Sequence, residues 1–164
     1  MNAAHSIDAP VYLMATAQQD DDSIIARALA ILAARIKGGP LMGSPREVRE
    51  FMTVQAAKHD GREVFSVLFL DAQNRAIEFR ELFYGTLTQT SVYPREVMRA
   101  ALELKAAAII LTHNHPSGST QPSRADELLT STLKTALALV DVRVLDHIIT
   151  AGGDSLSMAE KGLI

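Results

Sequence analysis

The sequence predicts an α/β layered domain with a mixed sheet, because strand-like apolar runs alternate with amphipathic helical segments along the chain. The string Pro-Arg-Glu-Val occurs at 45–48 and again at 94–97, each time with proline at the first position of a predicted helix. A length of 164 residues allows one domain with a proper core and is too short for two large ones. We therefore expect one domain over residues 41–164 and an N-terminal extension over residues 1–40.

Helix starts are marked by capping residues and by the spacing of apolar side chains. Ser23 has the character of an N-cap for a helix in the extension, and Ser44-Pro45-Arg46-Glu47 is a capping box that begins a second helix. The third expected helix begins at Pro94, and the fourth begins directly after Ser123. The expected helices span residues 24–36, 45–58, 94–105 and 124–140.

Strands are expected where β-branched and aromatic residues cluster between turn signals. The first run is apolar throughout, as in a buried central strand, and a turn at 71–74 returns the chain as its hairpin partner. The last strand leads to the turn Gly152-Gly153-Asp154 and a short tail. The expected strands span residues 63–70, 76–83, 108–112 and 142–150.

Composition excludes several kinds of site and partner. The chain has no cysteine, which removes disulfides, thiolate nucleophiles and every zinc site that uses cysteine. No apolar stretch reaches the roughly 18 residues that cross a bilayer, and residues 1–10 lack the pattern of a signal peptide, so we expect a cytoplasmic protein without a membrane partner. The net charge of −3 gives no general attraction to nucleic acid, although a local basic patch could form, and nothing indicates an oligomeric state.

The residues that carry chemistry lie at 113–118, in His-Asn-His-Pro-Ser-Gly, and at Asp126. Side chains two apart on a strand point the same way, so His113 and His115 could place two imidazole nitrogens on one cation. Asp126 follows at an expected helix start and could add a carboxylate oxygen. Two histidines and one carboxylate leave a fourth position for water, as in catalytic zinc sites. The alternative, ordinary polar residues at a strand end, fits a lone histidine better than this spaced pair.

Other polar residues near this motif have more than one interpretation. Ser123 and Asp126 also form a helix-capping arrangement, which is compatible with metal binding. Asn114 and Ser117 could bind substrate or hold the turn, and a turn role is favoured. His147 is expected to be a hydrogen-bonded histidine near the sheet end, with support of a metal ligand or contact with substrate as the alternative.

The spacing His113-x-His115, seven residues, Ser123, two residues, Asp126 resembles the metal-binding motif of the JAMM (MPN-type) metallopeptidases. Within that superfamily the chain is similar to the RadC branch, over roughly residues 41–164. The supporting stretches are Val-Leu-Phe-Leu-Asp at 67–71, Gly-Thr-Leu at 85–87, Tyr-Pro-Arg-Glu at 93–96, the 113–118 motif, Pro-Ser at 122–123 and Leu-Asp-His-Ile-Ile at 145–149.

The resemblance implies a curved mixed sheet flanked by helices, similar to the cytidine-deaminase fold, with a Zn²⁺ ion held by His113, His115 and Asp126. It also implies a hydrolytic glutamate that opens a strand before the histidine pair, and Glu63 fits that position. Glu78, Glu81 and Glu103 are competitors by residue type only. In this interpretation Glu63 is the general base, and the Ser123 hydroxyl donates to the oxyanion.

The function implied is hydrolysis of a peptide, isopeptide or other amide bond by metal-activated water. A DNA-processing or repair-associated factor that acts on nucleic acid is the alternative, and a catalytically silent scaffold is a third possibility. Full-length RadC proteins carry an N-terminal helix-hairpin-helix region that binds DNA. Residues 1–40 are too short for it and lack its glycine-rich hairpin, so we expect a short form.

Overall fold

The computed structural model describes residues 23–28, 30–31, 44–59, 61–85 and 91–164. Residues 23–28 and 30–31 are helical, in agreement with the helix predicted there, and the rest of that predicted helix lies outside the described residues. Within the described part of the chain, no helix combines the length and apolar character that a membrane crossing requires.

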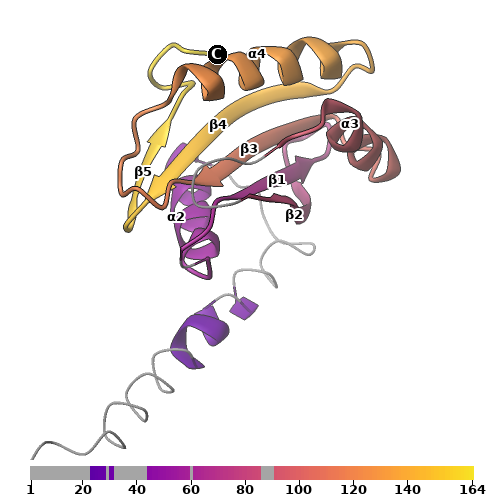
Figure 1. Cartoon of the computed structure of the whole chain (residues 1–164). Coiled ribbons are helices and arrows are strands. Elements are labelled where there is room, and N and C mark those ends of the chain that lie inside the picture. The colour runs from indigo at the N-terminus through magenta and orange to yellow at the C-terminus, as the bar shows by residue number, and fades with distance from the viewer. Residues whose placement is uncertain (1–22, 29, 32–43, 60, 86–90) are drawn as a thin grey trace, which may run out of the picture.

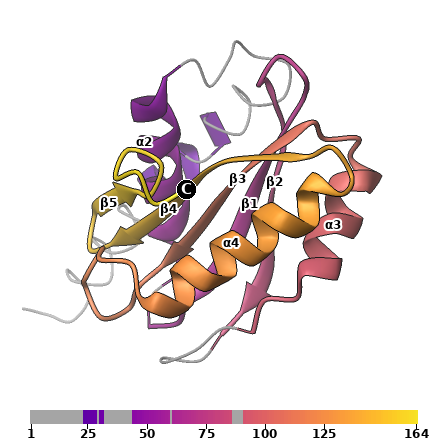
Figure 2. The same cartoon turned by 90° about the horizontal axis from the view of Figure 1, so that it is seen from above.

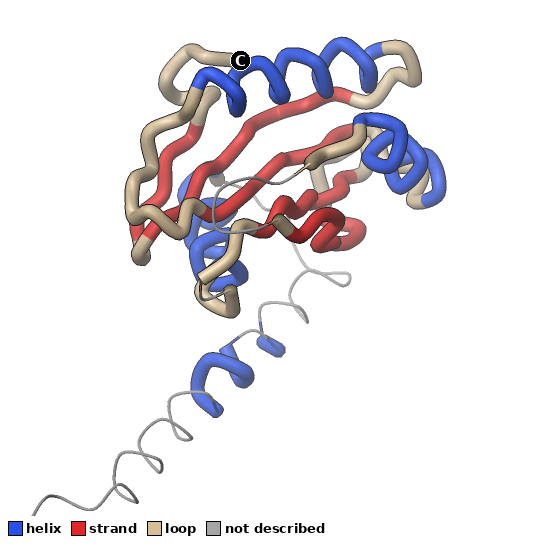
Figure 3. Tube along the Cα trace, viewed as in Figure 1, coloured by secondary structure: helices blue, strands red, loops and turns tan. Residues whose placement is uncertain are grey.

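Strands and helices alternate along the main domain (Figures 1 and 3). In chain order the elements are α2 (Pro45–Ala56), β1 (Val64–Leu70), β2 (Ala76–Tyr84), α3 (Pro94–Glu103), β3 (Ala108–Asn114), α4 (Arg124–Ala138), β4 (Arg143–Ala151) and β5 (Asp154–Ser157).

The five strands form one open mixed sheet in the order β2-β1-β3-β4-β5. The β3–β4 pair is parallel, with α4 as its crossover, and the other three pairs are antiparallel. Helices α3 and α4 cover one face of the sheet and α2 covers the other (Figures 1 and 2). The predicted α/β fold with a mixed sheet between helices is confirmed, and it is consistent with the JAB/MPN fold.

Strand alternation separates the core into two layers. Phe65, Val67 and Phe69 of β1 pack with α3 and α4, whereas Leu68 and Leu70 pack with α2. On β3 the odd-numbered apolar residues likewise join the α3/α4 layer and the even-numbered ones join the α2 layer. By the same alternation, His113 at the end of β3 belongs to the α4 side of the sheet.

Two predicted boundaries differ from the structure in ways that bear on the site. The third strand was expected to end at residue 112, but it continues to Asn114, so His113 lies inside the sheet. The expected tail after residue 153 is instead β5, which forms a hairpin with β4. Gly152 and Gly153 adopt positive φ values of 57° and 93°, and consecutive positive φ values suit the tight turn between two antiparallel strands.

Candidate metal centre

Three of the predicted site residues converge at the end of β3 and the start of α4. The Nε2 atoms of His113 and His115 are 2.8 Å apart. Asp126 Oδ1 lies 3.2 Å from His113 Nε2, and Asp126 Oδ2 lies 3.5 Å from His115 Nε2. One donor atom from each residue falls within 4.8 Å of the others, close enough to share one ion. Among the residues that the structure describes, no other trio of such side chains meets this test.

The N-cap of α4 orients Asp126. Ser123 Oγ accepts a hydrogen bond from the Asp126 backbone N–H at 3.2 Å, and the Ser123 N–H donates to Asp126 Oδ2 at 2.7 Å. The Ser123 hydroxyl also donates to Oδ2, at 2.6 Å. The predicted capping arrangement is therefore present. These hydrogen bonds hold the Asp126 carboxylate at the N-terminus of α4, with Oδ1 near His113.

The hydrogen bonds of His115 define which of its ring nitrogens is free. Its Nδ1 lies 2.7 Å from the Ser119 carbonyl oxygen, which can only accept, so Nδ1 carries the proton. The Nε2 lone pair then faces His113 and Asp126. A ring nitrogen with a free lone pair, beside a second ring nitrogen and a carboxylate, requires a cation or a shared proton between them. The donor set therefore fits a metal ion.

Charge at this cluster also favours a cation. Burial acts to raise the pKa of Asp126, but its contacts with the His113 and His115 rings, in their protonated forms, and with Ser123 outweigh it and hold that pKa well below its usual range. The Asp126 carboxylate in turn raises the pKa of His115 against the opposing effect of burial, with help from the Ser119 carbonyl and the charge of Glu63. Asp126 is thus a carboxylate anion at neutral pH.

Glu63 comes immediately before β1, on the strand next to the histidines. In the antiparallel β1–β3 register Phe65 pairs with His113, the last pair of the ladder, and Glu63 comes two residues before Phe65 at this end of the sheet. The negative charge of Glu63 contributes to the raised pKa of His115, which agrees with this proximity. The structure therefore brings Glu63 to the same end of the sheet as the candidate metal ligands.

The competing glutamates form other ion pairs. Glu81 Oε1 lies 2.9 Å from His59 Nε2, and Glu78 and Glu103 both pair with Arg80. Glu78, Glu81 and Glu103 therefore each pair with a residue other than the three candidate ligands.

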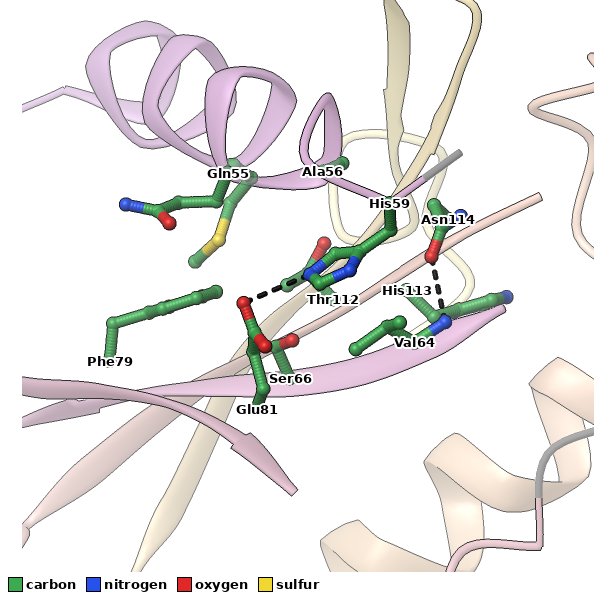
Figure 4. A pocket seen from close by; sticks show the side chains of 11 residues that line it. Gln55, Ala56, His59, Val64, Ser66, Phe79, Glu81, Thr112, His113 and Asn114 are labelled. Atoms are coloured by element: carbon green, nitrogen blue, oxygen red, sulfur yellow. Dashed lines mark hydrogen bonds and ion pairs between the residues drawn. The ribbon is translucent and has the colours of Figure 1, made fainter. Parts of the chain in front are cut away.

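Asn114 has a different role from the one predicted. It was expected to hold the turn, but it is the last residue of β3, and 8% of it is exposed. Its Oδ1 accepts from the Val64 N–H at 2.7 Å, as Figure 4 shows, and its Nδ2 donates to the Arg62 carbonyl at 2.8 Å. The side-chain amide therefore binds the backbone on both sides of Glu63. The expectation of a turn role for Asn114 is wrong.

The loop after His115 turns sharply at Gly118. The Gly118 N–H donates to the His115 carbonyl at 3.2 Å, and Gly118 has a φ of +82°, which favours glycine. Ser117 is exposed in this turn. A cleft of about 790 Å³ borders this loop, the end of α2 and the β4–β5 turn, and His115 is among its lining residues. Ile25 and Ala26 also line the cleft, and of the three candidate ligands only His115 does.

His147 of β4 is completely buried behind His113. Its Nε2 lies 2.8 Å from His113 Nδ1, and its Nδ1 lies 2.6 Å from Thr130 Oγ1 on α4. Burial, reinforced by the neighbouring His113, holds the pKa of His147 well below its usual range. The predicted hydrogen-bonded histidine is confirmed, and one of its partners is a candidate metal ligand.

The fold and the site together define a class of protein. A mixed sheet between helices, with two histidines at a strand end and an aspartate at the next helix start, describes a JAB (MPN-type) domain with a candidate metal centre. A family profile described as the RadC-like JAB domain matches residues 42–163, and the chain belongs to this family.

Similar proteins are known from several bacteria. A UPF0758 protein of Verminephrobacter eiseniae is 57% identical over 142 residues, which cover 87% of this chain and 60% of that protein. A UPF0758 protein of Variovorax paradoxus is 55% identical over 142 residues, which cover 87% of this chain and 63% of that protein. A UPF0758 protein of Methylibium petroleiphilum is 58% identical over 133 residues, which cover 81% of this chain and 60% of that protein. The chain thus spans about 60% of the length of these relatives.

Proposed function

We propose that this domain is a zinc-dependent hydrolase that cleaves a peptide, isopeptide or other amide bond. The observation that carries the proposal is the convergence of His113, His115 and Asp126 within 4.8 Å. Two imidazoles and one carboxylate suit zinc, and three protein ligands leave a position for water or substrate. When bound, zinc would polarise the amide carbonyl and lower the pKa of a water molecule.

Glu63 is the proposed general base. Glu63 lies at the same end of the sheet as the ligand cluster and its negative charge acts on His115, so we expect its carboxylate to accept a proton from the attacking water and later pass it to the leaving amine. Ser123 is the proposed oxyanion donor, and its hydroxyl already lies within hydrogen-bond distance of Asp126. One such donor typically contributes about 3 kcal/mol to the stabilisation of a transition state.

The cleft beside His115 is the proposed path of the substrate. Gly118, Gly152 and Gly153 are among its lining residues, and glycine allows another backbone to approach closely. Lys58 and His59 contribute the polar side of the same cleft. A cleft of this form suits an extended peptide segment, whose scissile bond would reach the ligand cluster at His115.

Metal content tests the ligand assignment directly. We expect the purified protein to bind about one zinc ion per chain, and His113→Ala and Asp126→Ala to lose it, because each removes one of three protein ligands. Glu127→Gln is the matched control, since Glu127 is the exposed neighbour of Asp126 in the same first turn of α4. Elemental analysis and equilibrium dialysis measure the stoichiometry. Full zinc occupancy in both ligand variants would refute this assignment.

A substrate panel tests the reaction class and the role of Glu63. Peptides, isopeptide-linked conjugates and DNA are incubated with the protein, with and without a chelator. We expect chelator-sensitive cleavage of an amide substrate, and a loss of about 10²–10⁴-fold in turnover for Glu63→Gln with its zinc retained. Chelator-sensitive cleavage of DNA alone would favour the DNA-processing alternative. Unchanged turnover in the zinc-loaded Glu63→Gln variant would remove Glu63 from the mechanism.

A further inference from the structure

We propose that His147 is a positioning residue of the metal centre, which holds His113 in the tautomer that offers Nε2 to the ion. The proposal rests on the proposed metal binding. It concerns a chain of three hydrogen bonds, in which His113 donates to His147, His147 donates to Thr130, and Thr130 donates to the backbone carbonyl of Asp126.

These three hydrogen bonds connect three elements of the fold. His113 is on β3, His147 is on the parallel neighbour β4, and Thr130 is on α4, one turn after Asp126. The contacts are 2.8 Å from His113 Nδ1 to His147 Nε2, 2.6 Å from His147 Nδ1 to Thr130 Oγ1, and 2.6 Å from Thr130 Oγ1 to the Asp126 carbonyl oxygen. Two ligands from separate elements are therefore joined through buried side chains.

The Asp126 carbonyl at the end of this series of hydrogen bonds determines which group donates in each of them. A carbonyl oxygen has no proton, so the 2.6 Å contact with Thr130 Oγ1 uses the single hydroxyl proton of Thr130. His147 Nδ1 must then donate to Thr130, which leaves Nε2 of the neutral His147 ring as an acceptor. His113 Nδ1 must donate to that acceptor, and its own Nε2 is left with a lone pair directed at His115 and Asp126.

Packing holds the two rings of this chain in place. The His113 ring is stacked on Phe65, with centroids 6.3 Å apart, and the His147 ring meets the edge of the same Phe65 at 5.7 Å. His147 has no exposed surface, and Thr130 is also buried. Water therefore does not compete for these hydrogen bonds, and the orientation of His113 depends on its protein partner.

The two candidate histidine ligands differ in how they are held. His115 donates to a backbone carbonyl, that of Ser119, which no substitution removes. His113 donates to a side chain. Partners of this kind orient metal-bound histidines, and their loss typically costs 10–100-fold in metal affinity. The support for His113 can therefore be removed without altering any of the three ligands.

Metal affinity is the first test. Zinc affinity is measured by competition with a chromogenic chelator for the full chain and for two variants, with folding followed by circular dichroism. His147→Leu removes the acceptor and should weaken zinc binding about 10–100-fold, while His147→Gln keeps an acceptor atom and should weaken it less. His59→Leu, which removes a histidine paired with Glu81, should leave zinc affinity unchanged. A folded His147→Leu variant with unchanged zinc affinity would overturn the proposal.

Proton positions give a second test that needs neither activity nor a large substitution. Long-range ¹H–¹⁵N correlations of the histidine rings should show His147 as the neutral Nδ1–H tautomer, with and without zinc. Thr130→Val removes the acceptor of the His147 Nδ1–H, so the His147 ring should then populate both neutral tautomers. Thr132→Val is the matched control, because Thr132 makes the same bond to its i−4 carbonyl at 2.8 Å on the exposed side of α4.

The outcomes separate the two proposals. A proton on Nε2 of His147 would mean that His147 donates to His113. That result would overturn the inference even if zinc binds. Failure of the full chain to bind zinc would instead refute the proposed function, while the tautomer of His147 would still decide whether the chain of hydrogen bonds has the stated direction.

Discussion

The Ser123 hydroxyl caps α4 and is also the proposed oxyanion donor, and it would serve these two roles at different stages. Its oxygen accepts the Asp126 N–H and caps α4, while its single proton is donated to Asp126 Oδ2. That proton cannot stabilise a developing oxyanion at the same moment. Catalysis by Ser123 therefore requires the hydroxyl to rotate away from Asp126, and the N-cap bond to its oxygen need not break.

Substitution of Ser123 tests its capping role and its proposed catalytic role separately. Ser123→Ala should lose about 1 kcal/mol of stability from the missing cap and about 100-fold in kcat from the missing donor. Ser44→Ala is the matched control, because Ser44 caps α2 through its bond to the Glu47 N–H. It should lose similar stability and retain kcat. Urea unfolding and steady-state kinetics measure the two effects, and a wild-type kcat in Ser123→Ala would contradict the proposed role.

Glu81 provides a pH-dependent contribution to stability. Burial acts to raise the pKa of Glu81, but hydrogen bonds from His59 and Tyr84 outweigh it and lower that pKa (Figure 4 shows the contact with His59). A carboxyl whose pKa is lower in the folded state stabilises the fold when it is ionised. This stabilisation is complete above the ordinary glutamate range and is lost as the pH falls below about 4.

Thermal unfolding over pH 3–7 checks this sign. The wild-type protein should have a higher Tm than Glu81→Gln at pH 7, and the difference should shrink as the pH falls toward 3 and Glu81 becomes protonated. A difference in Tm that is constant over this range would show that the charge of Glu81 contributes nothing to stability.

At the scale of elements, Asn114 completes the β1–β3 pairing where the regular ladder ends. The backbone ladder stops at Phe65 and His113, and the Asn114 side chain supplies the next two hydrogen bonds, with the Val64 N–H and with the Arg62 carbonyl. Glu63 lies between these two anchored groups. Its backbone is therefore held by β3, the strand that carries His113 and leads directly to His115.

Asn114→Ala should release the start of β1. Two backbone groups lose their partners, which should cost roughly 2 kcal/mol, and amide exchange at Val64 should accelerate. The Phe69 amide, at the far end of β1, is the internal control and should keep its protection. Zinc stoichiometry should stay the same while turnover falls, because Glu63 and not the ligand set is displaced. Unchanged exchange at Val64 would contradict the anchoring role of Asn114.

Local sequence patterns predicted the helices and strands well, but they predicted the contacts between these elements less well. The capping residues of α2 and α4 were predicted from short-range spacing, as was the shared orientation of the histidine pair, because these depend on residues within one or two turns. Strand β5 was missed because a four-residue strand is stabilised by its partner β4 more than by its own composition. The role of Asn114 was missed because its partners lie 50 and 52 residues earlier in the chain.

On the scale of the whole molecule, the candidate site is assembled from segments that meet only in the folded sheet. Glu63 precedes β1, the histidine pair lies at and just after the end of β3, Asp126 lies in the first turn of α4, and His147 lies on β4. The motif spacing indicated the ligands, and strand order resembling a known family indicated Glu63. The contact between His113 and His147 depends on the parallel β3–β4 register, which no local pattern encodes.

The alternation along β3 makes this site more sensitive to strand length than to the identity of most strand residues. One apolar residue can replace another between Ala108 and Leu111 and still leave His113 on the α4 side. Inserting or deleting one residue there, without a compensating bulge, would turn both imidazoles toward α2 and direct Asn114 toward Asp126. Divergence within this fold should therefore preserve the number of residues between the start of β3 and its histidines, even where the residues themselves drift.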